Sequence, residues 1–244
     1  MNDAELARWL ATGAGEVLLK LRETSGLTGK ALGQEGDRCA NEFLLRQLAV
    51  HRPDDAVLSE ETRSTPERLG NRRCWIIDPL DGTREYSEGR ADWAVHVGLA
   101  IDGKPQVGAV ALPSLGVTLD SGAPPQLCGD RQGLRMLVSR TRPAKEAVDV
   151  ARLLDAELVP MGSAGAKAMA VLRGEAEIYL HSGGQYEWDN CAPAAVAIAA
   201  GLHVSRLDGS AMHYNKESPE LPDLLICRPE LAETILAHVR MAEA

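Results

Sequence analysis

Cysteine is sparse in this 244-residue sequence, and its placement is unlike that of a disulfide scaffold. There are five cysteines, an odd number, and no two of them form a Cys-x-x-Cys pair. A small secreted domain held together by disulfide bonds usually has an even, regularly spaced set. The sequence therefore favours a reducing environment, and we expect a cytoplasmic protein.

Long apolar segments and an excess of basic residues are missing as well. No apolar run approaches the ~18 residues that a membrane-spanning helix needs, and the charged first residues lack the apolar centre of a signal peptide. The formal net charge of −9 argues against nucleic acid polymers and anionic membranes as partners, because both require clustered Lys and Arg. A small anionic ligand is compatible with this charge, since a bound cation can reverse the local field.

The composition that is present, 45% hydrophobic and 25% charged residues, is that of an ordinary globular protein. Apolar residues at helical spacing predict a helix up to about residue 21. We expect a glycine-containing loop next, and then a second helix from about Asp37 to Val50. The runs "DAVLSEE" and "RCWIIDPL" predict two strands, and "WAVHVGLAI" and "QVGAVALP" predict a hairpin with its turn at the Asp-Gly pair 102–103.

The second half of the chain alternates between short strands and helices. Strands are predicted in "LRMLVS", "AELVPMG", "AEIYL", "LHVS" and "DLLICRP", with helices near 144–154, 164–173 and 190–200 and in "ELAETILAHVRM". This alternation predicts a mostly parallel, layered α/β structure. The Gly- and Pro-rich stretch 120–133 is expected to separate an N-terminal α+β half, residues 1–133, from a C-terminal α/β half, residues 134–244.

Acidic residues gather at the predicted ends of strands and starts of helices. In "CWIIDPLDGTREYSEG" a strand ends with Asp78 and Asp81, and Gly82 and Thr83 follow at once. Two carboxylates ~4 Å apart repel each other by about 4 kcal/mol at an effective dielectric constant near 20, so a positive group should lie nearby. The other acidic residues at such places are Asp37, Glu60, Glu61 and Asp189.

Each of these acids has a simpler explanation when it is taken alone. Those at helix starts would be N-caps, the Glu-Glu pair would be solvated, and the two aspartates of "DPLDG" would shape a turn. Together they form a set of hard oxygen donors without His or Cys, which favours Mg²⁺ over zinc. Mg²⁺ often completes its coordination with phosphate, and two such ions could generate hydroxide and stabilise a leaving oxygen. The residues alone therefore predict Mg²⁺-dependent phosphoryl hydrolysis.

Three motifs, "LSEE", "DPLDGT" and "WDNCAPAA", resemble the ordered signature of the Mg²⁺-dependent, lithium-sensitive phosphatases of the inositol monophosphatase superfamily. The resemblance spans essentially the whole chain and includes the second-half segment "GSAGAKAMAVLRGEAEIYL". It implies a layered αβαβα sandwich, α+β in its first half and α/β in its second, similar to inositol monophosphatase and fructose-1,6-bisphosphatase. The segments "DGTREY" and "GGQYEWD" are closer to the 3′(2′),5′-bisphosphate nucleotidase branch, whereas "GQEGD" before Asp37 departs from the common Thr-x-Ala-Asp.

The resemblance implies a set of metal ligands. Glu60, Asp78 and the backbone carbonyl of Leu80 would hold one Mg²⁺ ion. Asp78 would bridge to a second ion, which Asp81 and Asp189 would complete, and a weaker third ion would lie beside Glu60 and Glu61. The cofactor implied is thus Mg²⁺, as two or three ions.

The resemblance also implies catalytic roles. Thr83, hydrogen-bonded to Asp37, would orient the attacking water and help to deprotonate it, and Glu60 would assist. The amides of Gly82 and Thr83 would hold the phosphate. The full set of expected substrate contacts is Glu60, Leu80, Asp81, Gly82, Thr83, Ser163, Lys167 and Asp189.

The sequence says less about which residues would contact the ribose, the base and the 5′-phosphate of a nucleotide. Ser163 would hydrogen-bond the ribose, and Lys167 would meet a phosphate unless it is a surface lysine. Arg140 and Arg142 would meet the 5′-phosphate, or they belong to a solvated helix start. Phe43 is the only phenylalanine, so base stacking would need a tyrosine (Tyr86, Tyr186 or Tyr214) or a tryptophan.

The predicted function is hydrolysis of the 3′-phosphate of 3′-phosphoadenosine 5′-phosphate, and of the related 3′-phosphoadenylyl sulfate, to AMP and adenylyl sulfate. The alternatives are an inositol monophosphatase, a fructose-1,6-bisphosphatase-like sugar phosphatase, and a catalytically silent nucleotide-binding protein. We expect a small-molecule nucleotide as partner, no nucleic acid polymer and no membrane, and a monomer or a homodimer.

Overall fold

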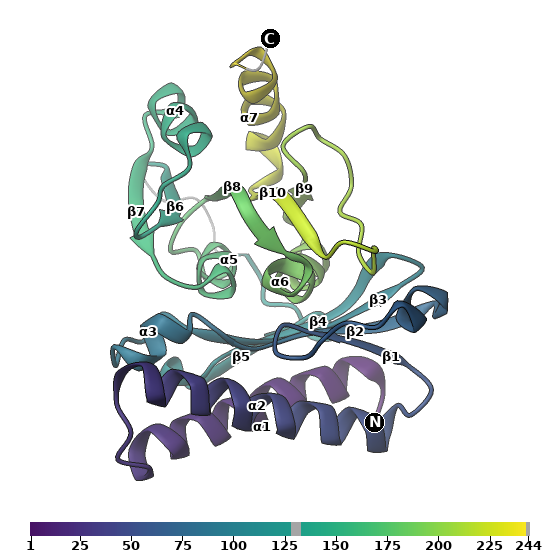
Figure 1. The fold of residues 1–244 in the computed structure, drawn as a ribbon. Helices are drawn as coiled ribbons and strands as arrows, with labels where there is room; N and C mark the ends of the chain where they lie inside the picture. Colours follow the sequence, from purple (N-terminus) through teal and green to yellow (C-terminus); the bar gives the residue numbers. More distant parts are fainter. Residues whose placement is uncertain (128–132, 243–244) are drawn as a thin grey trace.

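The fold is a sandwich of five layers, alternately helical and β (Figure 1). The computed structural model describes residues 1–127 and 133–242. Helices α1 (Asp3–Thr24) and α2 (Gly29–His51) form the first layer, and α5 (Ala164–Leu172) and α6 (Glu187–Ala199) lie between the two sheets. Helices α4 (Lys145–Leu154) and α7 (Pro229–Ala242) cover the far face of the second sheet. This is the predicted αβαβα sandwich.

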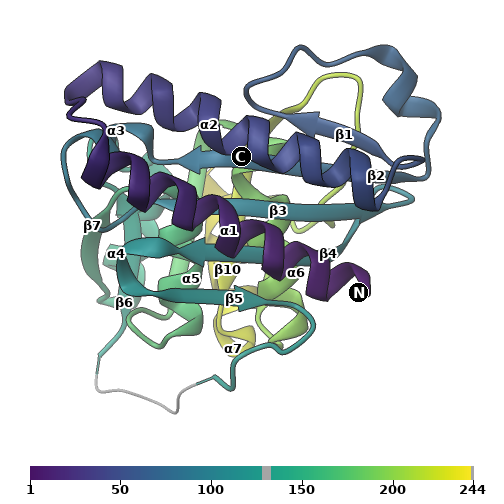
Figure 2. The same ribbon diagram turned by 90° about the horizontal axis from the view of Figure 1, so that it is seen from below.

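The first sheet has the order β1-β2-β3-β4-β5, with β1 parallel to β2 and the other pairs antiparallel. Seen from below, α1 and α2 run across this sheet (Figure 2). The hairpin between β3 and β4 turns at Asp102 and Gly103, whose φ values are 49° and 74°. Two successive positive φ values are typical of a two-residue hairpin turn, which confirms the predicted position. The strands are β1 (Ala56–Ser59), β2 (Arg73–Asp81), β3 (Ala94–Ile101), β4 (Lys104–Leu112) and β5 (Val117–Asp120), with the short helices η1 (Pro66–Gly70), α3 (Thr83–Ser87) and η2 (Pro113–Leu115) between them.

The second sheet is mixed, so the prediction of a mostly parallel sheet is wrong. Its order is β7-β6-β8-β10-β9; β7, β6 and β8 are parallel, whereas β10 is antiparallel to both β8 and β9. Strand β10 follows β9 through a loop instead of a helix, and it inserts between β8 and β9. The antiparallel direction needs no crossover helix. The strands are β6 (Arg135–Ser139), β7 (Glu157–Met161), β8 (Ile178–Tyr186), β9 (His203–Ser205) and β10 (Glu220–Cys227).

Helix α2 begins eight residues earlier than predicted, at Gly29, so Asp37 lies within the helix and does not open it. Two of the glycines that suggested a loop, Gly33 and Gly36, are packing sites. A Cβ at Gly33 would lie 2.8 Å from Cγ2 of Thr83, and one at Gly36 would lie 3.0 Å from Cδ2 of Leu80. Both glycines let α2 approach the segment after β2, which compensates for their low helix propensity.

Glycine also brings α6 against the first sheet. A Cβ at Gly98 of β3 would lie 2.9 Å from the amide nitrogen of Ala192, and one at Gly108 of β4 would overlap the Ala192 carbonyl oxygen. The helix therefore sits directly on the backbone of β3 and β4, at a distance that larger side chains would not allow. This close packing places the first turn of α6 beside the end of β2.

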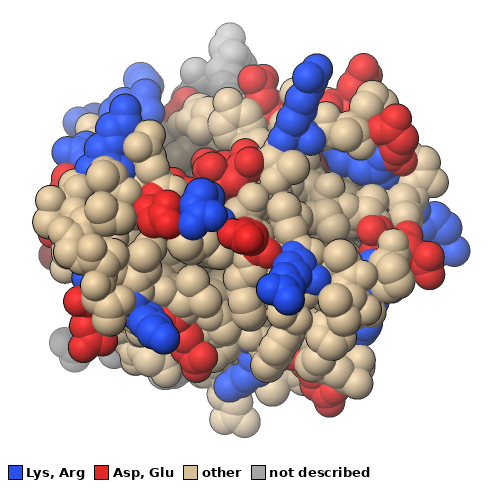
Figure 3. All heavy atoms as spheres, turned by 60° about the horizontal axis from the view of Figure 1, so that its bottom comes forward, with Lys and Arg blue, Asp and Glu red and all other residues tan. Residues whose placement is uncertain are grey.

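Among the described residues, Cys39, Cys74, Cys191 and Cys227 are free thiols; Cys128 lies outside the described residues. No helix in the described ranges has both the length and the apolar character needed to cross a bilayer. On the face shown in Figure 3, acidic and basic side chains are interspersed.

Candidate active site

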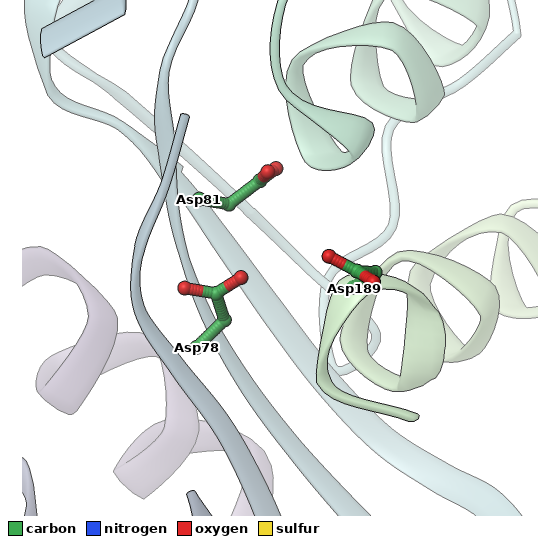
Figure 4. Close-up of side chains that lie close together, drawn as sticks. All are labelled: Asp78, Asp81 and Asp189. Atoms are coloured by element: carbon green, nitrogen blue, oxygen red, sulfur yellow. The ribbon is translucent and has the colours of Figure 1, made fainter. Parts of the chain in front are cut away.

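Three carboxylates meet between the first sheet and α6. Asp78 and Asp81 come from the end of β2 and Asp189 from the first turn of α6, and one ligand oxygen from each lies within 4.8 Å of the others. The close-up shows the three side chains directed toward a shared space (Figure 4). Residues 111 positions apart in the chain therefore form one acidic cluster.

An irregularity at the end of β2 presents the two aspartates. The pairing of β2 with β3 shifts register between Asp78 and Asp81, where Pro79 has no N–H to donate to the ladder. The N–H of Leu80 instead donates to Oδ1 of Asp78 at 3.0 Å. Gly82 follows in the left-handed conformation, with φ 89°, and α3 starts at the next residue. The motif "DPLDGT" is thus a bulged strand end and a tight turn.

Asp189 has a different local position from the one expected. Helix α6 begins at Glu187 with Tyr186 as its N-cap, so Asp189 is the third helical residue. Its Oδ2 accepts a hydrogen bond from the N–H of Tyr186 at 2.6 Å. The prediction that Asp189 is the N-cap is wrong because its carboxylate reaches back to the N-cap instead.

The electrostatics of the cluster are dominated by burial and by mutual repulsion. Burial raises the pKa of Asp78 well above its ordinary value, and the negative charges of Glu60, Asp81 and Asp189 add to this effect. Burial and the charge of Asp81 raise the pKa of Asp189 to about 7. Two like charges that lie within 4.8 Å of each other repel by at least about 3 kcal/mol at an effective dielectric constant near 20. A divalent cation would remove this repulsion.

Asp81 is the exception in the cluster, because donors surround it. Burial alone would raise its pKa, but His96, Ser163 and the N–H of Gly165 lower it to about 2. The N–H groups of Ala164 and Gly165 donate to its oxygens at 3.1 and 2.7 Å, and the Ser163 hydroxyl donates as well. Asp81 therefore joins the first sheet to the N-terminus of α5.

Thr83 and Asp37 form the hydrogen bond that the resemblance implies. The Thr83 hydroxyl lies 3.2 Å from Oδ1 of Asp37 and 3.1 Å from the carbonyl oxygen of Leu80. Burial raises the pKa of Asp37 to about 7, and the charge of Glu61 acts in the same direction. This group can therefore exchange a proton near neutral pH.

Glu60 follows β1, on the rim of the same cluster. Its side chain is exposed, but desolvation of the carboxyl group where it approaches Asp78 raises its pKa to about 7. The charges of Glu61 and Asp81 raise it further, whereas the Asp78 contact lowers it.

A pocket of about 280 Å³ opens beside Asp81 and Asp189. Arg140, one of the two predicted phosphate contacts, lines it and pairs with Glu85 at 2.7 Å and with Glu88 at 3.0 Å. Arg142 is exposed and is not among the residues lining this pocket. Of the two arginines predicted as phosphate contacts, Arg140 therefore lines this pocket, together with Arg84.

The two residues predicted to touch the nucleotide also line the pocket, but both have protein partners. Ser163 donates its hydroxyl to Asp81. Lys167 is buried, so the alternative of a surface lysine is wrong. Its Nζ donates to the carbonyl oxygens of Ser163 at 2.5 Å and Gly162 at 3.3 Å, and burial lowers its pKa.

Sequence reasoning missed His96, Glu85, Tyr179 and Gln185, and it set aside His181. All but His96 line the pocket, and His96 lies beneath it, against Asp81. His96 stands in the middle of an apolar run, "WAVHVGLAI", where one polar residue in a buried strand is a signal that could have been used. Glu85 lies in the segment "DGTREY", where nothing in the sequence marked it as a pocket residue.

The aromatic residues available for base stacking are reduced by burial. Tyr86 is buried and donates its hydroxyl to the Leu18 carbonyl oxygen, and Tyr214 is buried and bonds to Asn190. Tyr186 is 39% exposed and stacks on Trp188, with ring centroids 4.8 Å apart. Of the three tyrosines considered, only Tyr186 presents a ring to solvent.

A model of the inositol monophosphatase family matches residues 3–244. This chain belongs to the inositol monophosphatase family. Solved structures of the family share its fold. CysQ from Bacteroides thetaiotaomicron superposes with a TM-score of 0.79 at 24% identity, covering 93% of this chain and 97% of that one. Inositol monophosphatase II from Staphylococcus aureus gives 0.82 at 21% identity, covering 96% and 91%.

Two mycobacterial proteins share about half of their residues with this chain. It is 49% identical to the 3′-phosphoadenosine 5′-phosphate phosphatase of Mycobacterium leprae, over 98% of this chain and 94% of that protein. It is 50% identical to the protein of the same name from Mycobacterium tuberculosis, over 93% and 89%. The 3′(2′),5′-bisphosphate nucleotidase CysQ of Escherichia coli is 30% identical, over 73% and 77%.

Proposed function

We propose that this protein is a Mg²⁺-dependent phosphatase that removes the 3′-phosphate from 3′-phosphoadenosine 5′-phosphate and from the corresponding sulfate donor. The proposal rests on sequence identity: this chain is 49% and 50% identical to two mycobacterial phosphatases of that name, across nearly its whole length. The acidic cluster beside a pocket with basic side chains supports it. The products would be AMP or adenylyl sulfate, together with inorganic phosphate.

The donor set of the acidic cluster suits Mg²⁺. Asp78, Asp81 and Asp189 offer only carboxylate oxygens, which Mg²⁺ prefers. Glu60 and the carbonyl oxygen of Leu80 would add further ligands, for two or three ions in total. Bound Mg²⁺ would supply charge stabilisation for the phosphoryl group and increase the acidity of water.

The chain's own residues would position the nucleophile. Thr83 donates its hydroxyl to Asp37 or to the Leu80 carbonyl oxygen, so the hydroxyl oxygen keeps a lone pair for a water molecule. Asp37 would take up the proton of that water through Thr83, because its pKa of about 7 suits exchange at neutral pH. Glu60 would assist.

The reaction itself is a hydrolysis. The water oxygen forms a bond to phosphorus, the bond between phosphorus and the 3′ oxygen breaks, and the 3′ oxygen takes a proton. The N–H groups of Gly82 and Thr83, at the start of α3, would hold the phosphate oxygens.

The pocket beside the carboxylates would take the nucleotide. Arg140 and Lys167 line it, and a guanidinium group matches the geometry of phosphate. Ser163, engaged with Asp81, would reach the ribose only at the edge of the pocket. Tyr186 would offer a stacking surface for adenine, since it is the exposed tyrosine nearby.

The division at residues 133 and 134 is part of the proposal. Residues 1–133 would supply most metal ligands and the water-positioning pair, and residues 134–244 would supply Asp189 and the nucleotide contacts. A cytoplasmic location, favoured by the cysteine pattern, also belongs to the proposal.

The decisive experiment is a substrate panel with purified protein. Phosphate release is measured from 3′-phosphoadenosine 5′-phosphate, inositol 1-phosphate and fructose 1,6-bisphosphate at equal concentrations, with Mg²⁺ and with EDTA. We expect the adenosine bisphosphate to have the highest kcat/KM and EDTA to abolish turnover. A preference for inositol phosphate would refute the substrate but keep the mechanism, whereas full activity in EDTA would refute the mechanism.

A further inference from the structure

One buried histidine contacts both segments that carry the acidic cluster. His96 lies in β3 and has no exposed surface. Its Nε2 lies 3.0 Å from Oδ2 of Asp81, as an ion-pair contact without the alignment of a hydrogen bond. Its Nδ1 lies 2.9 Å from the carbonyl oxygen of Trp188.

The two contacts lead to different parts of the fold. Asp81 ends β2 in the first sheet, whereas Trp188 is in the first turn of α6 and immediately precedes Asp189. A single imidazole ring therefore touches one carboxylate of the cluster and the backbone next to another. The hydrogen-bond donors to Asp81 at residues 163–165 all belong to α5 and its N-cap.

The surrounding backbone is shaped to admit the ring. A Cβ at Gly165, in the first turn of α5, would overlap Nε2 of His96. Any other residue at position 165 would displace the imidazole from Asp81 or push α5 away from β3. If position 96 only filled the core, an apolar side chain would pack as well there. The space that Gly165 leaves beside Nε2 of His96 would then have no purpose.

We propose that His96 is a positioning residue, which fixes Asp81 and the first turn of α6 relative to each other so that Asp81 and Asp189 are ready to bind one cation. The proposal rests on the metal-dependent function proposed above. Groups that orient metal ligands typically change metal affinity by 10–100-fold when they are replaced. His96 would act in this way from outside the set of ligands.

Three substitutions separate its two contacts. His96→Asn keeps an amide near the position of Nδ1, so it retains a donor for the Trp188 carbonyl but not the Asp81 contact. His96→Gln carries its amide further out, toward Asp81. His96→Phe keeps a ring and removes both contacts. The matched control is His203→Gln, because His203 in β9 bonds to Ser205 at 2.8 Å and lies in the second sheet, away from the cluster.

The measurement is a Mg²⁺ titration without substrate, followed by calorimetry or by the rise in melting temperature, together with KM for substrate at saturating Mg²⁺. We expect His96→Phe and His96→Asn to raise the Mg²⁺ midpoint by about 10-fold or more, with partial recovery in His96→Gln. The substrate KM at saturating Mg²⁺ should change less than about 3-fold, far below the 10–100-fold effect on metal affinity. The control should keep the wild-type midpoint.

Each outcome decides between the two proposals. A wild-type protein that neither binds Mg²⁺ nor needs it for turnover refutes the proposed function before any variant is made. A wild-type protein that binds Mg²⁺, with His96 variants that share its midpoint, overturns the positioning role and leaves the function intact. If His96→Phe does not fold, the Asn and Gln variants still decide, because a purely structural histidine would lower both melting temperatures without moving either midpoint.

Discussion

The two walls of the candidate active site differ in the kind of group that they present. The wall from the first half carries Asp78 and Asp81 at the end of β2, with Asp37 of α2 and Glu60 on the rim near them. The wall from the second half carries one carboxylate, Asp189, and otherwise donors such as Ser163, Lys167 and Arg140.

Under the proposed function, metal binding would fall mainly to the first half of the chain and substrate recognition mainly to the second. A cluster of carboxylates attracts cations and repels phosphate, whereas Lys and Arg attract phosphate. A phosphate ester can bind between such walls only when cations cover the acidic one. The contrast is sharpest within the acidic wall itself, where Asp78 faces other acids and Asp81 faces donors.

The largest expected effect comes from replacing the two aspartates of β2. Asp78→Asn and Asp81→Asn should each reduce kcat/KM by about 10³-fold or more, because metal stabilisation of transition-state charge contributes several kcal/mol. The two substitutions should change the melting temperature of the metal-free protein in opposite directions. Asp78→Asn removes a buried, repelled carboxyl group and should raise the melting temperature, whereas Asp81→Asn weakens contacts with His96 and Ser163 and should lower it.

Turnover assays and thermal melts in EDTA check both parts of that prediction. Equal melting temperatures for the two variants would mean that the two aspartates share one environment, contrary to the structure. An active Asp78→Asn variant would remove Asp78 from the metal site.

A smaller effect is expected on the basic wall. Arg140→Ala should raise KM for the adenosine bisphosphate by about 10–100-fold with little change in kcat, because a charged hydrogen bond contributes about 1.5–3 kcal/mol. Hydrolysis of inositol 1-phosphate, which has no second phosphate, should be affected less. The matched control is Arg142→Ala, since Arg142 is exposed and outside the pocket lining; similar KM changes in both variants would contradict a specific phosphate contact.

The smallest effect is a pH dependence of the metal-free fold. The pKa values of Asp37, Glu60 and Asp189 are raised to about 7, so the folded state binds more protons than the unfolded chain between about pH 4 and 7. The stability that these groups contribute is present below pH 4 and is lost as the pH rises toward 7. Asp81, with its pKa lowered to about 2, contributes stability above pH 4 that is lost as the pH falls toward 2.

Melting temperatures in EDTA should therefore fall by a few degrees from pH 5 to pH 7.5, and Mg²⁺ should reverse the fall because it binds the deprotonated carboxylates. A melting temperature that rises from pH 5 to pH 7.5 in EDTA, with the same slope in an Asp189→Asn variant, would show that the acidic cluster does not control this pH dependence.

The resemblance of the motifs to a known family implied the five layers. The residue patterns themselves predicted most of the helices and strands, the hairpin turn at residues 102–103, and the motifs that carry the carboxylates. These features depend on local rules: apolar periodicity, the positive φ that an Asp-Gly pair tolerates, and short residue spacings. These local rules did not predict the start of α2 or the direction of β10. Gly33 and Gly36 are tolerated in a helix because of what packs against them, and β10 takes its direction from its place between β8 and β9.

Only the tertiary structure decided how the two walls meet. Asp81 and Asp189 are 108 residues apart in the chain, and neither local sequence says that one imidazole would contact Asp81 and the turn that carries Asp189. Burial and neighbouring charges, not residue type, give Asp81 a pKa of about 2 and Asp189 one of about 7. The sequence identifies the acidic residues, whereas the packing of α5 and α6 against the first sheet determines how deeply each is buried and which groups surround it.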